Sequence, residues 1–289
     1  MAMATRQPSD ALTAELVPVI WSSKVLHHTE SSLVAGEVMD LSWRSQLAIG
    51  DAITIPIDVE LTGAAVTVTS DTVMTNLKTS FTTGSTASIT ITTWWEIPVS
   101  VDDSVARQTQ VPGLLEKFAK NAAYGWRKKL DGDATALFSS LTGTGNGMDG
   151  QTFTDDLLLT IMEGLDETDI PPERAMVCDP STLADLRKID KFMSFDYSSN
   201  PLRLKGYRGR IDPYGLPVYM TNNLTSPSSV GNYGAVLHKE AIAMTVQSPM
   251  DVEKWREERR HSWVINTSGF YGVDAIRPTF GTYFYTRSY

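Results

Sequence analysis

Between Ile49 and Leu141 the chain first alternates polar and β-branched residues and then changes to a helical spacing of apolar ones. Two Thr-rich stretches, 52–61 and 88–97, repeat with a period of two, which is typical of half-exposed strands. The polar, Gly-containing residues 62–86 join them, so the pattern predicts a long two-stranded ribbon with a tip in this middle part. A two-stranded ribbon alone in water is marginally stable. We therefore expect residues 60–88 to lie on an adjacent subunit.

After a break at 111–113, apolar residues follow at intervals of three and four, which define one face of a helix. These positions are Leu115, Phe118, Ala119, Ala122, Trp126, Leu130, Ala134, Leu137, Phe138 and Leu141. They predict a helix of roughly 28 residues, about 42 Å long. Gly125 and Gly132 weaken it locally. The basic run 127–129 lies mostly on the opposite face, which we interpret as solvated, with contact to a partner's carboxylates as the alternative.

Beyond residue 150 the pattern changes to shorter helices and strands. Thr154 is expected to cap a helix that ends at about Leu165, and Asp179 opens a second, capped helix. Strands are predicted at 174–178, 215–220, 235–238, 241–246, 263–265, 270–278 and 282–286. The charged, Gly-containing stretch 188–212 predicts a long surface loop.

The length and composition are those of an ordinary globular protein. The 289 residues are 42% hydrophobic and 20% charged, which allows a sizeable core in one large domain or two modest ones. No apolar run approaches the roughly 20 residues needed to cross a bilayer. Residues 1–10 lack the apolar segment of a secretory signal. We therefore expect no association with a membrane.

The net charge of −9 bears on nucleic acid as a partner. A protein that binds nucleic acid without regard to sequence needs a basic surface to displace counterions from phosphate, so the charge argues against that class. A container for nucleic acid remains compatible, because an acidic inner wall repels phosphate and lets the polymer slide. Solubility alone would also explain an acidic chain, and the charge does not separate the two explanations.

The sequence predicts no catalytic residue, no cofactor and no metal site. The single cysteine, Cys178, excludes an internal disulfide and a multi-cysteine metal site, and we interpret it as a small buried strand residue. The adjacent His27 and His28 point to different sides of any helix or strand, and the other histidines are isolated. The common phosphate-loop, nucleophile-elbow and zinc-protease motifs are missing from the sequence. Trp94 and Trp95 are interpreted as core or interface packing, with a carbohydrate or base platform as the alternative.

Three sequence segments follow one another along the chain. They are 121–133 on the long helix, 215–223 in the region of short helices and strands, and 271–278 near the C-terminus. Together with the order of elements over essentially the whole chain, they make it resemble the major capsid protein of tailed bacteriophages. The resemblance implies an α+β chain with the HK-ninety-seven-like fold. That fold combines an N-arm, an extended β-hairpin loop, a long spine helix, a peripheral domain and an axial domain.

The resemblance divides the chain into five segments. They are an N-terminal arm at 1–48, an extended loop with the entry to the peripheral domain at 49–100, the spine helix of the peripheral domain at 101–142, an axial domain at 143–236 and peripheral β-strands at 237–289. The expected anchors of the arm on a neighbour are Trp21, Val17, Val19 and Ile20, because a large aromatic residue buries the most area. Loop 188–212 is expected near a symmetry axis, where its mixed charges would meet a neighbouring copy. The basic residues of that loop are Lys188, Lys191, Arg203, Lys205, Arg208 and Arg210.

The resemblance implies a structural protein without enzymatic activity. It would assemble with itself into hexamers and pentamers of an icosahedral shell, enclosing double-stranded DNA without sequence-specific binding. Its location would be the virion, after assembly in the host cytoplasm. A separate scaffolding protein, a portal and a decoration protein are the further partners that the family suggests.

Two alternative functions stay open. An encapsulin-like nanocompartment shell has a related fold and encloses cargo enzymes instead of DNA. A protein of a different class, a β-rich carbohydrate-binding protein or hydrolase, would use Trp94 and Trp95 with nearby acids. Some family members also join subunits through a Lys–Asn isopeptide bond, for which Lys78 and Asn266 are the candidates. The sequence shows no nearby acid to catalyse that bond, so we do not expect it.

Overall fold

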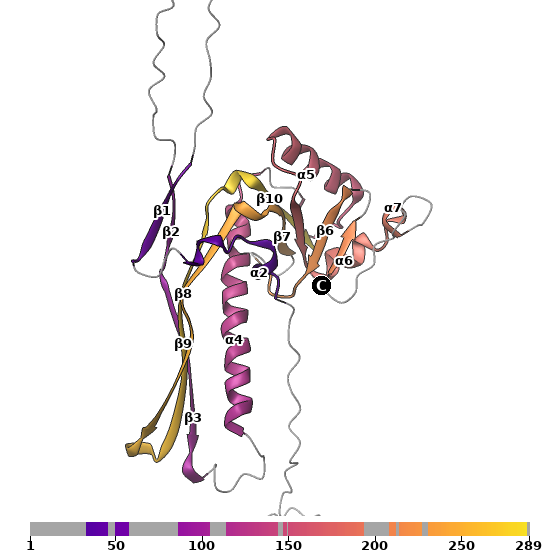
Figure 1. The fold of residues 1–289 in the computed structure, drawn as a ribbon. Helices are drawn as coiled ribbons and strands as arrows, with labels where there is room; N and C mark the ends of the chain where they lie inside the picture. The colour runs from indigo at the N-terminus through magenta and orange to yellow at the C-terminus, as the bar shows by residue number, and fades with distance from the viewer. Residues whose placement is uncertain are drawn as a thin grey trace, which may run out of the picture.

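The computed structural model describes residues 33–45, 50–57, 86–104, 114–143, 147–148, 150–193, 208–211, 214–226 and 231–287. Within these ranges, an elongated part made of a long helix and a three-stranded sheet joins a compact part built around a five-stranded sheet (Figure 1). A two-stranded ribbon extends from the region where the two parts meet. No helix in the described ranges has the length and apolar character needed to cross a membrane.

Helix α4 (Leu114–Ala136) is the long helix, and the 3-10 turn η2 (Leu137–Ser140) continues it. Ala122, Trp126 and Leu130 are buried on the face toward the three-stranded sheet, as their spacing of four predicts. The α-helical part has 23 residues, fewer than expected, because the chain tightens into η2 over its last turn. The predicted long helix is thus confirmed, with an earlier end.

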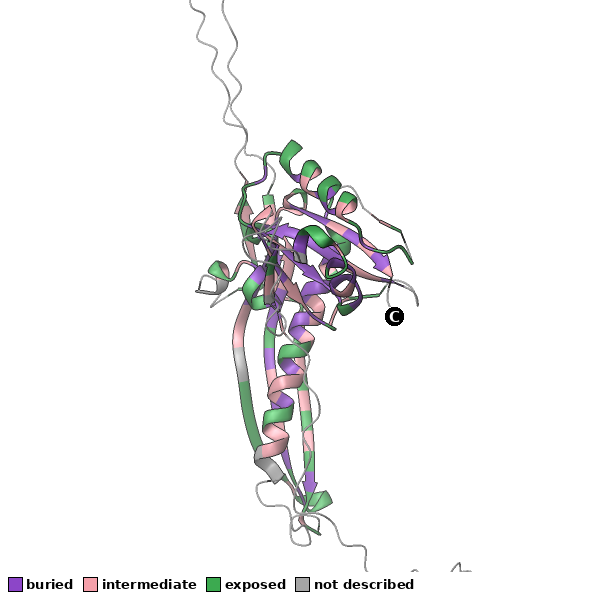
Figure 2. Cartoon of the chain, turned by 90° about the vertical axis from the view of Figure 1, so that its right-hand side faces the viewer, coloured by how far each residue is buried: buried purple, intermediate pink, exposed green. Residues whose placement is uncertain are grey.

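Strands β3 (Thr93–Asp102), β9 (Ser262–Ala275) and β8 (Ile242–Glu257) form an antiparallel sheet in that order. The helix α4 lies close to β9 because Gly269 has no side chain. A Cβ atom built at Gly269 would lie 2.6 Å from Nε1 of Trp126. Figure 2 shows the long strands and α4 running side by side, with buried residues concentrated where they join the five-stranded sheet.

The ribbon consists of β1 (Ala52–Pro56) and β2 (Thr86–Thr90), which pair antiparallel from Ala52↔Thr90 to Pro56↔Thr86. The predicted second ribbon strand at 88–97 is therefore corrected. A break at 91–92 divides it, and Thr93 onward pairs with β9 instead. The reason is burial, because Trp95 finds apolar neighbours under α4 that the ribbon does not offer. The predicted tip lies outside the described residues.

The five-stranded sheet forms the centre of the compact part. Its strands, in order across the sheet, are β10 (Gly281–Arg287), β7 (Gly231–His238), β4 (Arg174–Cys178), β6 (Leu216–Met220) and β5 (Arg208–Ile211). Only β4 and β6 pair in parallel among these described strands. We expected 282–286 to lie with the peripheral strands of 237–289, yet β10 pairs with β7 along its whole length. The C-terminal segment is thus divided between the two sheets.

Helices cover both faces of the five-stranded sheet. On one face, α5 (Asp155–Glu167) and α6 (Pro180–Leu186) share a core with Met176 and Cys178. On the other face, Phe138 and the short helix α2 (Ala35–Val38) pack against Val177. The remaining short turns are α2 (Ala35–Val38), η1 (Ser42–Ser45), α7 (Asp190–Met193), η4 (Lys239–Ala241), η5 (Glu258–Arg260) and η6 (Pro278–Phe280).

Two predicted helix caps and the buried cysteine are confirmed. The side chain of Thr154 accepts a hydrogen bond from the Leu157 N–H, and Asp179 accepts one from the Thr182 N–H at 2.9 Å. Cys178 is fully buried in β4, and burial, with a smaller effect of the Asp179 charge, raises the pKa of its thiol. Cys178 is therefore a packing residue.

Candidate assembly interfaces

The root of the ribbon, which is strand β2 where it joins the rest of the subunit, is held by contacts within its own subunit. The Thr90 N–H donates to Oδ2 of Asp274 at 2.7 Å, and Ile89 is fully buried beside Ile276. The ribbon also crosses β9 at Gly272, where a Cβ atom would lie 2.3 Å from the Thr90 carbonyl oxygen. Residues 86–88, which we expected on a neighbour, therefore belong to this subunit's own sheet and core.

The root of the N-terminal arm is held by a buried carboxylate on α4. Asp131, only 2% exposed, accepts hydrogen bonds from the Val34 N–H at 2.9 Å and the Ala35 N–H at 2.7 Å. Its second oxygen accepts from Nδ2 of Asn223 at 2.9 Å. An anion is stabilised at the first N–H groups of a helix. The Asp131 carboxylate therefore connects α4 to the N-terminal arm and to the segment that follows β6. The expected anchors of the arm, 17–21, lie outside the described residues.

Sequence reasoning missed Asp131 as a functional residue. The only local signal was a carboxylate placed directly beside the apolar face of the predicted helix, next to Leu130. Its partners lie 92 to 97 residues away along the chain, so nothing near it in sequence identifies them.

Trp94 and Trp95 point to opposite faces of β3 and have different environments. Trp95 packs against Trp126 and Tyr271 under α4, as core packing predicts. Trp94 is 63% exposed and stacks on Phe270, with ring centroids 4.9 Å apart. Trp255, 42% exposed, lies on the same outer face, so this face carries large apolar groups in contact with solvent. Exposed apolar patches of this kind mark interaction surfaces.

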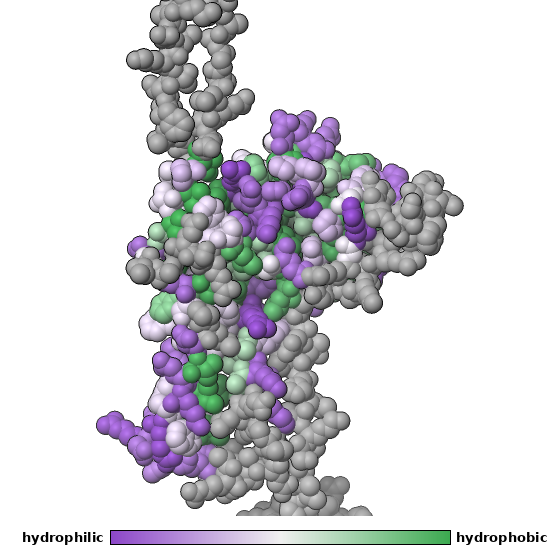
Figure 3. Space-filling model, in the orientation of Figure 1, coloured by the Kyte–Doolittle hydropathy of each residue, from purple (hydrophilic) through white to green (hydrophobic). Residues whose placement is uncertain are grey.

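The far end of the β8–β9 hairpin carries mixed charges, visible as a hydrophilic region in Figure 3. Arg256 pairs with Asp103 at 2.9 Å and with Glu258 at 3.1 Å, and Nζ of Lys254 lies 4.6 Å from the ring centroid of Trp263. Exposed ion pairs contribute little to the stability of the fold. In general, charges on an exposed edge steer and orient a partner more than they stabilise the fold.

The exposed face of α4 is basic, as the sequence indicated. Lys120, Arg127 and Lys128 are exposed on the side away from the sheet. Lys129, the last residue of the basic run, instead pairs with Asp133 within the helix. Asp133 also accepts a hydrogen bond from the hydroxyl of Tyr271, and burial together with this bond raises the pKa of Tyr271.

A family model described as phage capsid protein matches residues 84–283, which include α4, the three-stranded sheet and the five-stranded sheet except the end of β10. The chain belongs to this family of phage capsid proteins. No curated protein sequence matches it. The predicted family and the structural function of a tailed-phage major capsid protein are thereby confirmed.

Solved structures agree on the fold of this capsid protein. The structure of Mycobacterium phage Che8 has a TM-score of 0.71 at 19% identity, covering 93% of this chain and 96% of that one. The capsid asymmetric unit of cyanophage Pam1 has a TM-score of 0.72 at 11% identity, covering 96% and 99%. The mature capsid of bacteriophage PhiM1 has a TM-score of 0.63 at 13% identity, covering 93% and 91%. The predicted α+β fold class is confirmed, and the capsid protein associates with its own copies in the virion capsid.

The stretch 188–212 is not one long loop as predicted, because its described part contains α7 and β5, and two of its lysines form ion pairs within the subunit. Lys191 pairs with Asp155, which also accepts a hydrogen bond from the Tyr214 hydroxyl at 3.0 Å. Lys188 pairs with Asp185 at 3.0 Å. These two lysines therefore bind carboxylates of the capsid protein's own subunit. Arg203 and Lys205 lie outside the described residues.

The C-terminal strand of the capsid protein is tied to α6 by a buried carboxylate that sequence reasoning also missed. Asp185, 1% exposed, accepts from both Nε and Nη2 of Arg287, at 3.1 and 2.5 Å. Burial alone would raise the pKa of Asp185. The hydrogen bonds from Arg287, Lys188 and the Phe153 N–H outweigh burial and hold that pKa below its ordinary value.

One expectation about crosslinking is corrected by the structure. Asn266 donates from Nδ2 to a carboxylate oxygen of Glu96 at 2.9 Å, so an acid does lie beside the candidate asparagine. The two residues are 170 positions apart and meet across the β3–β9 pair, which is why the sequence did not show it. Lys78 lies outside the described residues. In the parts of the chain that the structure describes, no group of three or more His, Cys, Asp or Glu could hold a metal ion.

Proposed function

We propose that this capsid protein forms hexamers and pentamers that close into an icosahedral shell around double-stranded DNA. The observation that carries the proposal is the exposed, stacked pair Trp94–Phe270 on the outer face of the three-stranded sheet. A capsid protein gains stability by burying such a face against another copy. Each contact is repeated many times in a closed shell, so modest interfaces give a stable assembly.

We propose the following segments for the assembled subunit. Within the arm at 1–48 and the extended loop at 49–100, the residues beyond the roots reach neighbouring copies. The spine helix is 101–142, the axial domain is 143–236, and 237–289 is the peripheral return apart from β10. The hydrogen bonds at Asp131 and Thr90 support this division, because they hold the two extended segments at their roots. Strand β10 then connects the peripheral β-strands to the five-stranded sheet of the axial domain.

The charge of the chain supports a non-specific role toward DNA. With a net charge of −9, the capsid protein encloses DNA without binding its sequence, and its wall lets the polymer move. We infer a structural role without catalysis, assembly in the host cytoplasm, and separate scaffolding, portal and decoration proteins as partners. A nanocompartment shell is the alternative within the same fold.

The test combines size-exclusion chromatography with negative-stain microscopy of the expressed protein. We expect closed shells from the wild type, and we expect the Trp94→Ser variant to remain a folded protomer with a strongly reduced shell yield. Trp95→Ala is the contrasting variant, because it removes core packing and lowers the free energy of unfolding by about 2–4 kcal/mol. A small monodisperse wild-type species that binds carbohydrate would refute the proposal, and shells filled with a cargo enzyme would favour the nanocompartment.

A further inference from the structure

The exposed face of α4 carries a row of basic side chains that neither the ribbon root nor the arm root uses. The row consists of Lys117, Lys120, Arg127 and Lys128. Their spacing places them on the side of the helix away from Trp126 and the three-stranded sheet, over a length of about 16 Å. Figure 2 shows exposed residues recurring along α4. The positive charge is therefore spread along the helix instead of being gathered at one end.

The described carboxylates of α4 do not neutralise this row. Asp131 is buried and accepts hydrogen bonds from the arm root, and Asp133 pairs with Lys129. Neither Arg127 nor Lys128 forms an ion pair with any residue that the structure describes. Both side chains are exposed, so their charge is available to an anionic partner.

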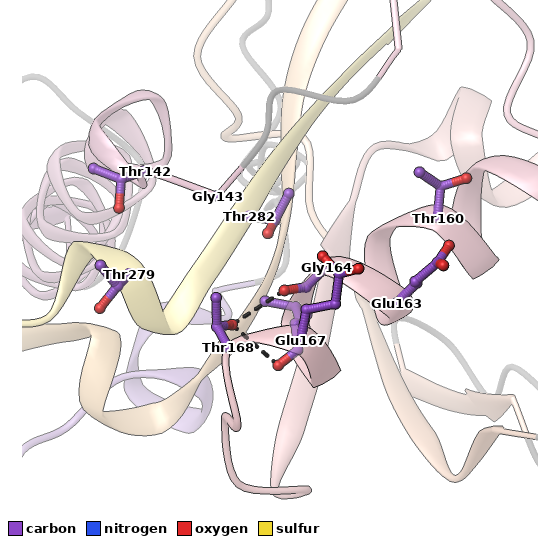
Figure 4. A pocket seen from close by; sticks show the side chains of 10 residues that line it. Thr142, Gly143, Thr160, Glu163, Gly164, Glu167, Thr168, Thr279 and Thr282 are labelled. Carbon is purple, nitrogen blue, oxygen red and sulfur yellow. Dashed lines mark hydrogen bonds between the residues drawn. The ribbon is translucent and has the colours of Figure 1, made fainter.

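Two other exposed faces of the subunit carry the opposite charge. Figure 4 shows Glu163 and Glu167 on α5, beside a groove lined by this helix and the start of β10. On the outer face of the three-stranded sheet, the exposed Glu96 and Asp251 lie on either side of Ser268. Both acidic faces repel phosphate, whereas the α4 face attracts it. A polyanion that approaches the subunit is therefore directed to α4.

The composition of the α4 face favours nucleic acid over protein as the partner. Interfaces between proteins have apolar, often aromatic centres, and none of the exposed large apolar residues in the described ranges lies on α4. Interfaces with nucleic acid are instead polar and strongly positive. Double-stranded DNA carries one charge per about 1.7 Å of its axis, so a row of about 16 Å meets several phosphates at once. Arginine binds a phosphate through two N–H groups and lysine binds it as a point charge.

We propose that the exposed face of α4 contacts the phosphate backbone of the packaged double-stranded DNA and is therefore turned to the interior of the shell. This inference rests on the proposed function, because it names the surface by which the capsid protein meets the DNA that it encloses. The contact is made to phosphates alone, so it does not depend on the base sequence. A short row of cations in a chain of net charge −9 binds weakly, and the many copies in a shell add such contacts without fixing the DNA in place.

The experiment measures the fluorescence anisotropy of a labelled duplex of about 30 base pairs, titrated with the unassembled full chain at several salt concentrations. In the double variant Arg127→Gln, Lys128→Gln we expect a roughly tenfold or greater loss of affinity at low salt, and a salt dependence reduced by about two phosphate contacts. The matched control Lys239→Gln, Arg259→Gln removes one lysine and one arginine that are exposed outside α4, and it should stay within about twofold of the wild type. Arg127→Lys keeps the charge and should retain the salt dependence of the wild type.

Closed shells provide the second part of the test. We expect the double variant to form shells, and we expect intact empty shells to bind added duplex much more weakly than the unassembled protein, because α4 is turned inward. The inference is overturned if the double variant binds the duplex as tightly as the wild type, if the control loses as much affinity, or if intact shells bind added duplex as well as the unassembled protein does.

Loss of shells in the double variant with unchanged DNA affinity would assign the row to carboxylates of another copy, and that result also overturns the inference. Wild-type shells from a protein without DNA affinity would overturn this inference and leave the proposed function intact.

Discussion

At the scale of single residues, two buried carboxylates hold together segments that are distant in sequence. Asp131 receives the first N–H groups of α2, and Asp185 receives Arg287 from the last strand. Both are nearly inaccessible to water, so their hydrogen bonds cannot be replaced by solvent when a partner is removed. These residues position the arm and the C-terminal strand.

Replacement of the second carboxylate, Asp185→Asn, should lower the free energy of unfolding by about 2–4 kcal/mol, because Arg287 loses its charged partner. The control Asp169→Asn, at an exposed turn, should change it by less than about 0.5 kcal/mol. Urea denaturation measures both. Equal, small effects of the two substitutions would contradict the assigned role of Asp185.

The pH dependence of stability provides a second test at Asp185. Its pKa is lowered in the folded state, so its contribution is present above the unfolded pKa of about 3.9 and is lost as the pH falls through the folded value. We expect the wild type to lose stability more steeply than Asp185→Asn below about pH 4. Parallel stability curves for the two proteins over this range would rule out the carboxylate as the source.

At the scale of elements, glycines decide how closely α4 approaches its sheet. Gly269 lies under Trp126, whereas Gly132 has no atom within 4 Å of an added Cβ. We expect Gly269→Ala to lower the melting temperature, because the helix would have to move away from β9. Gly132→Ala should raise stability by about 0.5–1 kcal/mol through helix propensity. Thermal melts followed by circular dichroism compare them, and a stabilising Gly269→Ala would contradict the close contact.

The ribbon is the second element whose role can be tested. Replacing residues 60–85 by a short turn keeps β1 and β2, and with them the contacts of Ile89 and Thr90. We expect a protomer with an unchanged circular dichroism spectrum that no longer forms closed shells, because the segment proposed to reach a neighbour is gone. Normal shells in negative-stain images of this variant would show that the ribbon tip is dispensable.

At the scale of the whole molecule, we expect assembly to order the extended segments beyond their roots. Outside the roots, hydrogen exchange should be fast in the arm at 1–48 and the loop at 60–88 of the unassembled protein and strongly slowed in shells. The reason is that ordering entropy of about 1–2 kcal/mol per residue must be offset by burial on neighbours. Residues 33–40 and 86–90 should be protected in both states, because they already belong to the subunit's core and sheet. Equal protection of the loop between 60 and 85 in protomer and shell would remove the physical basis of the assembly proposal.

The sequence by itself determined the long helix, the caps at Thr154 and Asp179, the first strand of the ribbon and, through the resemblance, the family. Apolar spacing and capping depend on residues a few positions apart, so these features are visible in a local pattern. The order of such elements was enough to indicate a capsid protein and its α+β fold.

The tertiary structure alone decided the break at 91–92, the pairing of β10 with β7 and the different exposure of Trp94 and Trp95. It also decided the contacts of the buried carboxylates. Each of these depends on residues far apart in sequence meeting in space, such as Gly281 and Leu237 in the β10–β7 pair or Ala35 and Asp131. Which strands pair and which side chains become buried is set by long-range packing and by the pairing of buried polar groups. No local pattern in the sequence shows this.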